Sequence, residues 1–253
     1  MCRHVAYLGA PVTLARVLLD PPRSLLAQSW APCDMRGSGT VNADGFGVGW
    51  YDERGRPVRY RRSVPMWADP SFADLAQSVH TQAILAAVRN ATTGMPVTES
   101  ACAPFREGRW LFSHNGVVTG WPEALSDLAG SLDTTDLMTL EAPTDSAVLW
   151  ALLRRRLLAG EDLVESVEDL TKAVARAAPG SRVNLLAMDG ETIVASTFGH
   201  SLSVLRKVDG VVVSSEPFGD PGEDWASVPD RHLVIATGSS LKVQPLYTKG
   251  GHP

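Results

Sequence analysis

The chain has 253 residues and a mass of 27.1 kDa, a length that suits either one large domain or two small ones. Hydrophobic residues make up 44% and charged residues 20% of the sequence, with 22 glycines and 17 prolines, which excludes disordered, collagenous and low-complexity proteins. The net charge of -5 gives no broad basic field for a phosphate backbone, so we expect no nucleic-acid partner.

Short strands dominate the predicted elements of the first half of the chain. Apolar runs bounded by glycine, proline or aspartate predict strands at 3–8, 46–51, 58–61, 83–88 and 110–113, and a helical turn at 14–19. The turn from Asp52 to Pro57 predicts a hairpin between the second and third strands. Cys2 then lies at the beginning of the first strand.

Two amphipathic helices follow. Apolar residues recur at three- and four-residue spacing from Val148 to Leu157 and from Leu163 to Ala178. From Val183 onward, short β-rich runs return, among them 211–213 and 233–235. Strands, then helices, then strands predict an α+β layered fold rather than a doubly wound parallel sheet. With no internal repeat and no linker, we expect one domain over residues 1–253.

The three cysteines, Cys2, Cys33 and Cys102, lack the spacing of a zinc site or a disulfide framework. We interpret Cys33 and Cys102 as structural or incidental thiols. The N-terminal apolar stretch contains Arg16 and lacks a small-residue cleavage site, and the apolar region 146–158 is interrupted by three arginines. These features predict a soluble cytoplasmic protein without a membrane span.

Cys2 is the most informative residue for the chemistry of this protein. A small side chain at the second position permits removal of Met1, which leaves Cys2 as the mature N-terminus. Its α-amine, with a reference pKa of about 7.7 to 8.0, can then act as a base toward its own thiol. The chain contains no G-x-S-x-G elbow for a rival serine nucleophile. A buried structural thiol at the start of a strand is the alternative interpretation.

The sequence Ser113-His114-Asn115-Gly116 directly follows a predicted strand. Asn-Gly is a common hairpin turn, and that interpretation stays open. An acyl-transfer site, however, needs donors aimed at a developing oxyanion, and an Asn amide with a Gly backbone N–H provides two. We interpret His114 as a satisfied structural imidazole, and the alternative is that it orients the oxyanion turn.

Two charged residues offer partners for an amino-acid substrate. Arg89 follows a predicted strand, and it either is a solvated strand end or binds a carboxylate with its planar guanidinium. Asp145 precedes a predicted helix, where it either complements the helix dipole or binds a substrate ammonium group. Both alternatives stay open for each residue.

Together these motifs resemble the class II glutamine amidotransferases, members of the N-terminal nucleophile hydrolase superfamily. The resemblance lies in the order of several segments: Met1-Cys2-Arg3, Asn42 to Trp50, Arg89 with Thr92, Asn115-Gly116, Thr144-Asp145-Ser146, and Ser215-Glu216-Pro217 followed by Trp225 and Val228-Pro229. The glycines of Asp44 to Gly49 depart from a dinucleotide fingerprint, and we interpret this stretch as a close-packed strand near the site.

The resemblance implies an αββα sandwich, with two antiparallel sheets between helical layers. It also implies Cys2 as the nucleophile, Asn115 and Gly116 as the oxyanion hole, Arg89 as the partner of the glutamyl α-carboxylate and Asp145 as the partner of its α-ammonium. Thr92 joins Arg89 as a substrate-binding candidate. The implied chemistry needs no metal and no organic cofactor.

A narrower similarity points to the ergothioneine-pathway amidohydrolases, which cleave γ-glutamyl-hercynylcysteine sulfoxide. It rests on residues 2–9, 28–32 and 39–45. A glutaminase subunit that supplies ammonia to a separate synthase and an inactive γ-glutamyl-binding module stay as alternatives. Because family-like residues extend from Cys2 to Pro229, they leave no room for a synthase domain, which favours hydrolysis of a small γ-glutamyl substrate.

Aromatic side chains can bind the trimethylammonium of a hercynyl group. For Trp30, Trp50 and Tyr7, however, we expect core packing.

Overall fold

A computed structural model describes residues 2–34 and 41–247 of the chain. Its strands are β1 (Arg3–Thr13), β2 (Phe46–Tyr51), β3 (Pro57–Arg62), β4 (His80–Val88), β5 (Phe105–Glu107), β6 (Trp110–Val117), β7 (Arg182–Met188), β8 (Thr192–Ser196), β9 (Ser203–Lys207), β10 (Gly210–Ser214), β11 (Ala226–Ser227), β12 (His232–Thr237) and β13 (Leu241–Pro245). Its α-helices are α1 (Leu14–Leu18), α2 (Leu25–Gln28), α3 (Pro70–Ser78), α4 (Ser126–Ala129), α5 (Thr134–Met138), α6 (Asp145–Leu158) and α7 (Leu163–Ala177).

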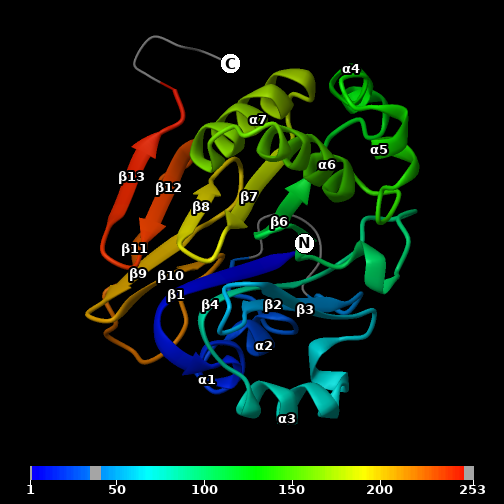
Figure 1. Ribbon diagram of the computed structural model, residues 1–253. Helices are drawn as coiled ribbons and strands as arrows, with labels where there is room; N and C mark the ends of the chain where they lie inside the picture. Colours follow the sequence, from blue (N-terminus) through cyan, green and yellow to red (C-terminus); the bar gives the residue numbers. More distant parts are fainter. Residues whose placement is uncertain (1, 35–40, 248–253) are drawn as a thin grey trace.

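The strands of these described residues form two sheets whose neighbouring strands run antiparallel. One sheet has the order β11-β9-β10-β1-β4-β2-β3, and the other has the order β13-β12-β8-β7-β6-β5. Helices α1, α2 and α3 lie on the first sheet, whereas α6 and α7 cover the second (Figure 1). This arrangement confirms the predicted αββα sandwich.

Alternation along β1 shows how the layers are built. Val5 and Tyr7 pack toward α1, α2 and α3, while Ala6 and Leu8 belong to the apolar layer between the sheets. The same alternation places His4 between the sheets, where its Nδ1 lies 3.3 Å from Ser113 Oγ of β6. Two residues further back, just before the strand begins, Cys2 is expected on this inner side as well.

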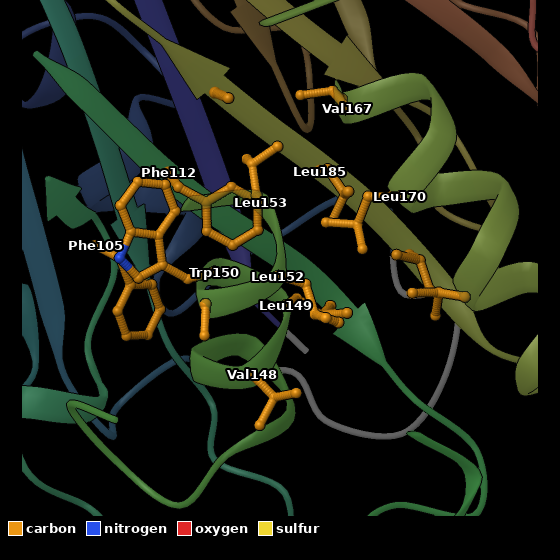
Figure 2. Packing of buried hydrophobic residues seen from close by; sticks show 14 of the residues in the cluster. Phe105, Phe112, Val148, Leu149, Trp150, Leu152, Leu153, Val167, Leu170 and Leu185 are labelled. Atoms are coloured by element: carbon orange, nitrogen blue, oxygen red, sulfur yellow. The ribbon is translucent and has the colours of Figure 1, made fainter. Parts of the chain in front are cut away.

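Helices α6 and α7 begin where the sequence supplies capping side chains. Thr144 Oγ1 accepts a hydrogen bond from the Ala147 N–H, and Asp162 accepts from Val164 and Glu165. Both helices then pack onto the outer face of the second sheet, where Trp150 stacks on Phe112 with ring centroids 5.6 Å apart (Figure 2). The two predicted helices are therefore confirmed to within a few residues.

Other expectations need correction. Strand β6 extends to Val117, and Asn115 and Gly116 pair with Asn184 and Val183 of β7, so the hairpin-turn interpretation of Asn115-Gly116 is wrong. A long partner strand overrides the local turn preference of Asn-Gly here. The sequence pattern also does not reveal α2, α3, α4 and α5, because most of these helices are shorter than two turns and show little periodicity.

Among the described residues, no helix is both long and apolar enough to cross a membrane.

We expect Leu153→Ala to destabilise the fold by about 2–5 kcal/mol, because Leu153 is completely buried between α6 and the sheet. Leu158→Ala, on the same helix but 62% exposed, is the matched control and should change the free energy of unfolding by less than about 0.5 kcal/mol. Urea denaturation measures both. Equal losses in the two variants would contradict this account of the α6 packing.

Candidate active site

Cys2 lies directly before β1, with its side chain partly exposed. Because Arg3 pairs with Val88 in the antiparallel β1–β4 ladder, Cys2 comes to lie beside Arg89. The Cys2 Sγ is 3.9 Å from the Asn90 carbonyl oxygen. In Figure 1 the start of β1 lies close to β6, between the two helix layers.

The other two thiols have different surroundings. Cys102 is fully buried, and its Sγ lies 3.4 Å from the carbonyl oxygens of Arg62 and Thr98. Burial raises the pKa of the Cys102 thiol to about 11, so it stays protonated near neutral pH. Cys33 is exposed and donates its backbone N–H to Glu216. The structural interpretation therefore fits Cys102.

Arg89 is buried at the end of β4 and is fixed by the segment before β2. Its N–H donates to the Gly45 carbonyl and its own carbonyl accepts from the Asp44 N–H, at 2.8 and 2.9 Å. The Arg89 Nη1 donates to the Pro96 carbonyl at 2.8 Å. Within residues 2–34 and 41–247 no ion pair joins a carboxylate to this guanidinium, which leaves its charge suited to a substrate carboxylate.

Thr92 occupies the loop after Arg89, and its side chain is exposed. Its backbone carbonyl accepts a hydrogen bond from Met95 at 2.9 Å, which closes a turn. Thr92 is therefore close to Arg89 along the chain, but its side chain is exposed whereas that of Arg89 is buried.

The glycine-rich stretch predicted as a close-packed strand is β2, and it lies beside the site. A Cβ on Gly47 would collide with the Ala103 carbonyl, so β2 can lie this close to Ala103 only with glycine at position 47. The Asp44 side chain accepts a hydrogen bond from the Ala91 N–H at 2.8 Å. Asp44 thereby holds the start of the loop that follows Arg89.

Asn115 is buried on β6 and faces the space between the sheets. Its Nδ2 donates to Ser215 Oγ at 3.4 Å, while its Oδ1 is buried without a partner among the described residues. Ser215 in turn accepts a hydrogen bond from the His4 N–H at 2.9 Å and donates to the His4 carbonyl at 3.2 Å. One Asn115 amide hydrogen therefore points at the first sheet.

Gly116 follows Asn115 where only a glycine fits. A Cβ at this position would collide with the Arg182 carbonyl of β7. The glycine thus lets β6 and β7 stay paired through the segment that carries the two predicted oxyanion donors.

Asp145 is buried at the first position of α6, next to the end of β6. Its Oδ2 accepts from the Val118 N–H at 3.2 Å, and its Oδ1 accepts from the Ser146 N–H at 2.7 Å. Ser146 Oγ lies 3.0 Å from His114 Nδ1, and His114 Nε2 lies 3.4 Å from the Arg182 carbonyl. His114 is satisfied at both nitrogens, as expected for an imidazole that positions its surroundings.

A buried ion pair holds the backbone of Cys2, and sequence reasoning assigns it no role. Arg3 Nε lies 2.6 Å from Glu216 Oε1, with both side chains at most 3% exposed. Arg3 Nη1 donates to the Cys2 carbonyl at 3.0 Å, and Arg3 Nη2 donates to the Asp34 carbonyl. The only sequence feature that could have indicated this ion pair is that Arg3 and Glu216 both belong to segments that carry the family resemblance.

The aromatic residues near the N-terminal half differ in their exposure. Tyr7 is buried and Trp50 is partly buried, as expected for core packing. Trp30 is 45% exposed and contacts Trp67 edge to face, with ring centroids 5.7 Å apart. Core packing is therefore the wrong expectation for Trp30, because α2 ends before it and turns its ring outward.

The class II glutamine amidotransferase profile matches residues 23–210, about three quarters of the chain. The chain belongs to the class II glutamine amidotransferases. It is 43% identical to the γ-glutamyl-hercynylcysteine sulfoxide hydrolase of Mycolicibacterium smegmatis over 97% of this chain and 100% of that protein. It is 41% identical to the protein of the same name from Mycobacterium tuberculosis H37Rv, over 97% of each chain.

Two solved structures share the fold. A glutamine aminotransferase class-II domain protein from Silicibacter pomeroyi superposes with a TM-score of 0.70 at 24% identity, over 98% of this chain and 100% of that chain. Glutamine phosphoribosylpyrophosphate amidotransferase from Bacillus subtilis superposes with a TM-score of 0.67 at 17% identity, over 97% of this chain and 49% of that chain.

His4, His114 and His200 are buried, and burial keeps their imidazoles neutral near pH 7. Burial is the main cause that lowers the pKa of His4 to about 3, and the electrostatic interactions with His114, His200 and Arg3 act in the same direction. Burial, with Arg182 as the next cause, lowers the pKa of His200 to about 3. Burial also lowers the pKa of His114, against the opposing charge of Asp145.

We expect the stability of this amidotransferase-family chain to fall as the pH decreases from 7 to 5. An unfolded histidine, with a pKa of about 6.5, binds a proton that folded His4 and His200 exclude until about pH 3. His4→Asn should make the slope of unfolding free energy against pH shallower, whereas exposed His80→Asn should keep the original slope. Urea denaturation at several pH values measures this, and a stability independent of pH between 7 and 5 would contradict it.

Proposed function

We propose that this chain hydrolyses the γ-glutamyl amide of γ-glutamyl-hercynylcysteine sulfoxide, releasing glutamate and hercynylcysteine sulfoxide. The observation that carries the proposal is the 41–43% identity, over almost the full length, to hydrolases named for this substrate. Two features of the geometry support it: Cys2 lies beside Arg89, whose guanidinium has no carboxylate partner among the described residues, and Asp145 accepts a hydrogen bond from Val118, directly after the strand that carries Asn115.

Each group of a γ-glutamyl substrate has a candidate partner. Arg89 suits the α-carboxylate, because its buried guanidinium can form two parallel hydrogen bonds to it. Asp145 suits the α-ammonium, because its carboxylate is oriented by the Val118 and Ser146 N–H groups. The exposed Thr92 hydroxyl is a further candidate contact on the Arg89 side.

The proposed reaction starts with Cys2 as the N-terminal residue after removal of Met1. The α-amine, directly or through a water molecule, takes the thiol proton, and Sγ forms a bond to the γ-carbonyl carbon. The negative charge that develops on the carbonyl oxygen is stabilised by Asn115 Nδ2 and the Gly116 N–H. Asn115 can do this because its amide is already oriented by Ser215.

The intermediate then collapses. The C–N bond breaks, the departing amine takes the proton held by the α-amine, and a γ-glutamyl thioester remains on Cys2. Water, deprotonated by the α-amine, attacks the thioester carbonyl. The C–S bond breaks, the thiolate regains the proton, and glutamate leaves. Every step uses only groups of the chain, the substrate and water.

We expect Cys2→Ala to abolish turnover while the urea midpoint stays close to that of the unchanged protein, because Cys2 lies before β1 and is only partly buried. Cys33→Ala is the matched control and should keep full activity, since Cys33 is exposed. Intact mass spectrometry should show that Met1 is absent from the active protein. Normal turnover by Cys2→Ala, or full activity with Met1 retained, would count against the mechanism.

We expect product analysis to show hydrolysis of γ-glutamyl-hercynylcysteine sulfoxide in preference to glutamine when the two are supplied in parallel. The physical reason is that binding energy from the larger amine half is available only with the conjugate. A strong preference for glutamine, or activity only with a partner protein, would instead favour an ammonia-supplying subunit. Absence of any glutamyl adduct on Cys2 would favour an inactive binding module.

A further inference from the structure

Arg182 is the first residue of β7, which pairs with the strand that carries the proposed oxyanion donors (Figure 1). Asn115 of β6 lies opposite Asn184 of β7, and Val117 lies opposite Arg182. Asn115 and Arg182 are therefore diagonal neighbours across the two strands. Such neighbours are about 7–8 Å apart, a separation that a long side chain can bridge.

Alternation along β7 places Arg182 on the same face of the second sheet as Asn115. Leu186 belongs to the apolar layer between the sheets, whereas Val183 packs with the residues of α6 and α7. Arg182 is an even number of residues from Leu186, so it belongs to the face that is turned toward the first sheet. That face carries the Asn115 amide, which bonds to Ser215 of the opposite sheet.

The side chain of Arg182 lies along the loop that follows β8. A Cβ on Gly199 would be 2.8 Å from Arg182 Cγ, so the stem of the arginine packs closely against this glycine. In the same loop, Ser201 donates its hydroxyl to the Ser215 carbonyl at 2.9 Å, and the Ser215 hydroxyl holds the Asn115 amide. The arginine and the proposed oxyanion donor therefore contact one connected set of residues.

The backbone is fixed on both sides of Arg182. On one side the Val183 N–H donates to the Phe198 carbonyl at 2.8 Å. On the other side Ser181 Oγ accepts a hydrogen bond from the Thr119 N–H at 2.9 Å. A guanidinium on such a fixed backbone loses less conformational freedom when it binds a ligand.

Arg182 is partly buried, yet no carboxylate pairs with its guanidinium within residues 2–34 and 41–247, and its Nε is buried there without a hydrogen-bond partner. Arg89 is in the same situation. The other buried or partly buried arginines of these residues each have a carboxylate partner: Arg3 has Glu216, Arg59 and Arg61 have Glu141, Arg154 has Asp136, and Arg156 has Asp169. Since a partly desolvated charge needs a partner, Arg182 is suited to an anionic group of a ligand.

The proposed substrate carries such a group close to the bond that breaks. In γ-glutamyl-hercynylcysteine sulfoxide the scissile nitrogen belongs to a cysteine, and the cysteine carboxylate is attached to the carbon next to that nitrogen. With the scissile carbonyl at Asn115, this carboxylate falls within reach of the diagonal neighbour Arg182, whose planar guanidinium can form two parallel hydrogen bonds to it. Glutamine has only hydrogen atoms on its amide nitrogen and offers Arg182 no partner.

We propose that Arg182 binds the carboxylate next to the scissile amide and thereby selects γ-glutamyl conjugates of α-amino acids over glutamine. This inference rests on the proposed function and assigns a residue to the amine half of the substrate. Arg89 and Arg182 then bind the two carboxylates on either side of the γ-glutamyl amide.

Two short amides isolate this contact, because γ-glutamyl-alanine and γ-glutamyl-ethylamide differ only in the carboxylate next to the amide nitrogen. The unchanged protein should hydrolyse γ-glutamyl-alanine with a kcat/KM that is higher by about tenfold or more. Arg182→Met, which removes the charge but keeps a long stem, should bring the ratio of the two kcat/KM values close to that of equal substrates. The loss should be mainly in KM, since the carboxylate takes no part in the bond changes.

Arg155→Met is the matched control. It removes the same charge from an exposed position on α6, and both amides should be hydrolysed as by the unchanged protein. Arg182→Lys keeps the charge without the planar pair of donors and should give an intermediate ratio. If thermal melting shows that Arg182→Met is unfolded, Arg182→Lys takes its place, and an unaltered ratio in that variant would contradict the assignment.

The outcomes separate the two proposals. Hydrolysis of γ-glutamyl-alanine in preference to the ethylamide, without hydrolysis of the hercynyl conjugate, would overturn the proposed substrate and leave the Arg182 assignment standing. Equal kcat/KM values for the two amides in the unchanged protein, or an equal loss for both in Arg182→Met, would overturn the Arg182 assignment alone. If neither amide is hydrolysed, their inhibition constants against the conjugate replace kcat/KM, with the same ratios expected. Neither hydrolysis nor inhibition with any of these compounds would overturn both proposals.

Discussion

The buried ion pair between Arg3 and Glu216 is the interaction on which the candidate site depends. Two charges at most 3% exposed are stable only when each is fully partnered, and the guanidinium and carboxylate here also bind backbone groups of Cys2 and Cys33. Loss of one partner would leave the other charge buried, which typically costs about 3–5 kcal/mol. The pair thus anchors the residue before β1 to the end of β10.

The space between the sheets changes character along the strands. In the middle it is filled by apolar side chains such as Ala6, Leu111 and Val213, which hold the sheets together. Toward the site the same inward-facing positions become His4, Asn115 and Ser215, linked by hydrogen bonds. Burial keeps the His4 imidazole neutral, so this polar layer orients the Asn115 amide without adding a histidine charge between the sheets.

Local patterns predicted the parts of the fold that have a strong period. The three- and four-residue spacing of apolar residues was sufficient for α7, because one face of that helix is buried, and the turn from Asp52 to Pro57 was sufficient for the β2–β3 hairpin. Asn115-Gly116 was ambiguous, since the choice between turn and strand depends on pairing with β7, nearly 70 residues away. Local patterns also could not predict the exposure of Trp30, because that exposure depends on where the neighbouring helix ends.

The sequence by itself determined the chemical groups: a cysteine at position 2, an arginine and an aspartate for a zwitterionic substrate, and an Asn-Gly pair for an oxyanion. Only the tertiary structure decided which residues surround them. Ser215 and Glu216 reach Asn115 and Arg3 across 100 and 213 residues of chain. The Glu216–Arg3 contact follows from the pairing of β10 with β1, and the Ser215–Asn115 contact follows from the packing of one sheet on the other. No local period encodes either one, because residues far apart become neighbours only when the sheets assemble.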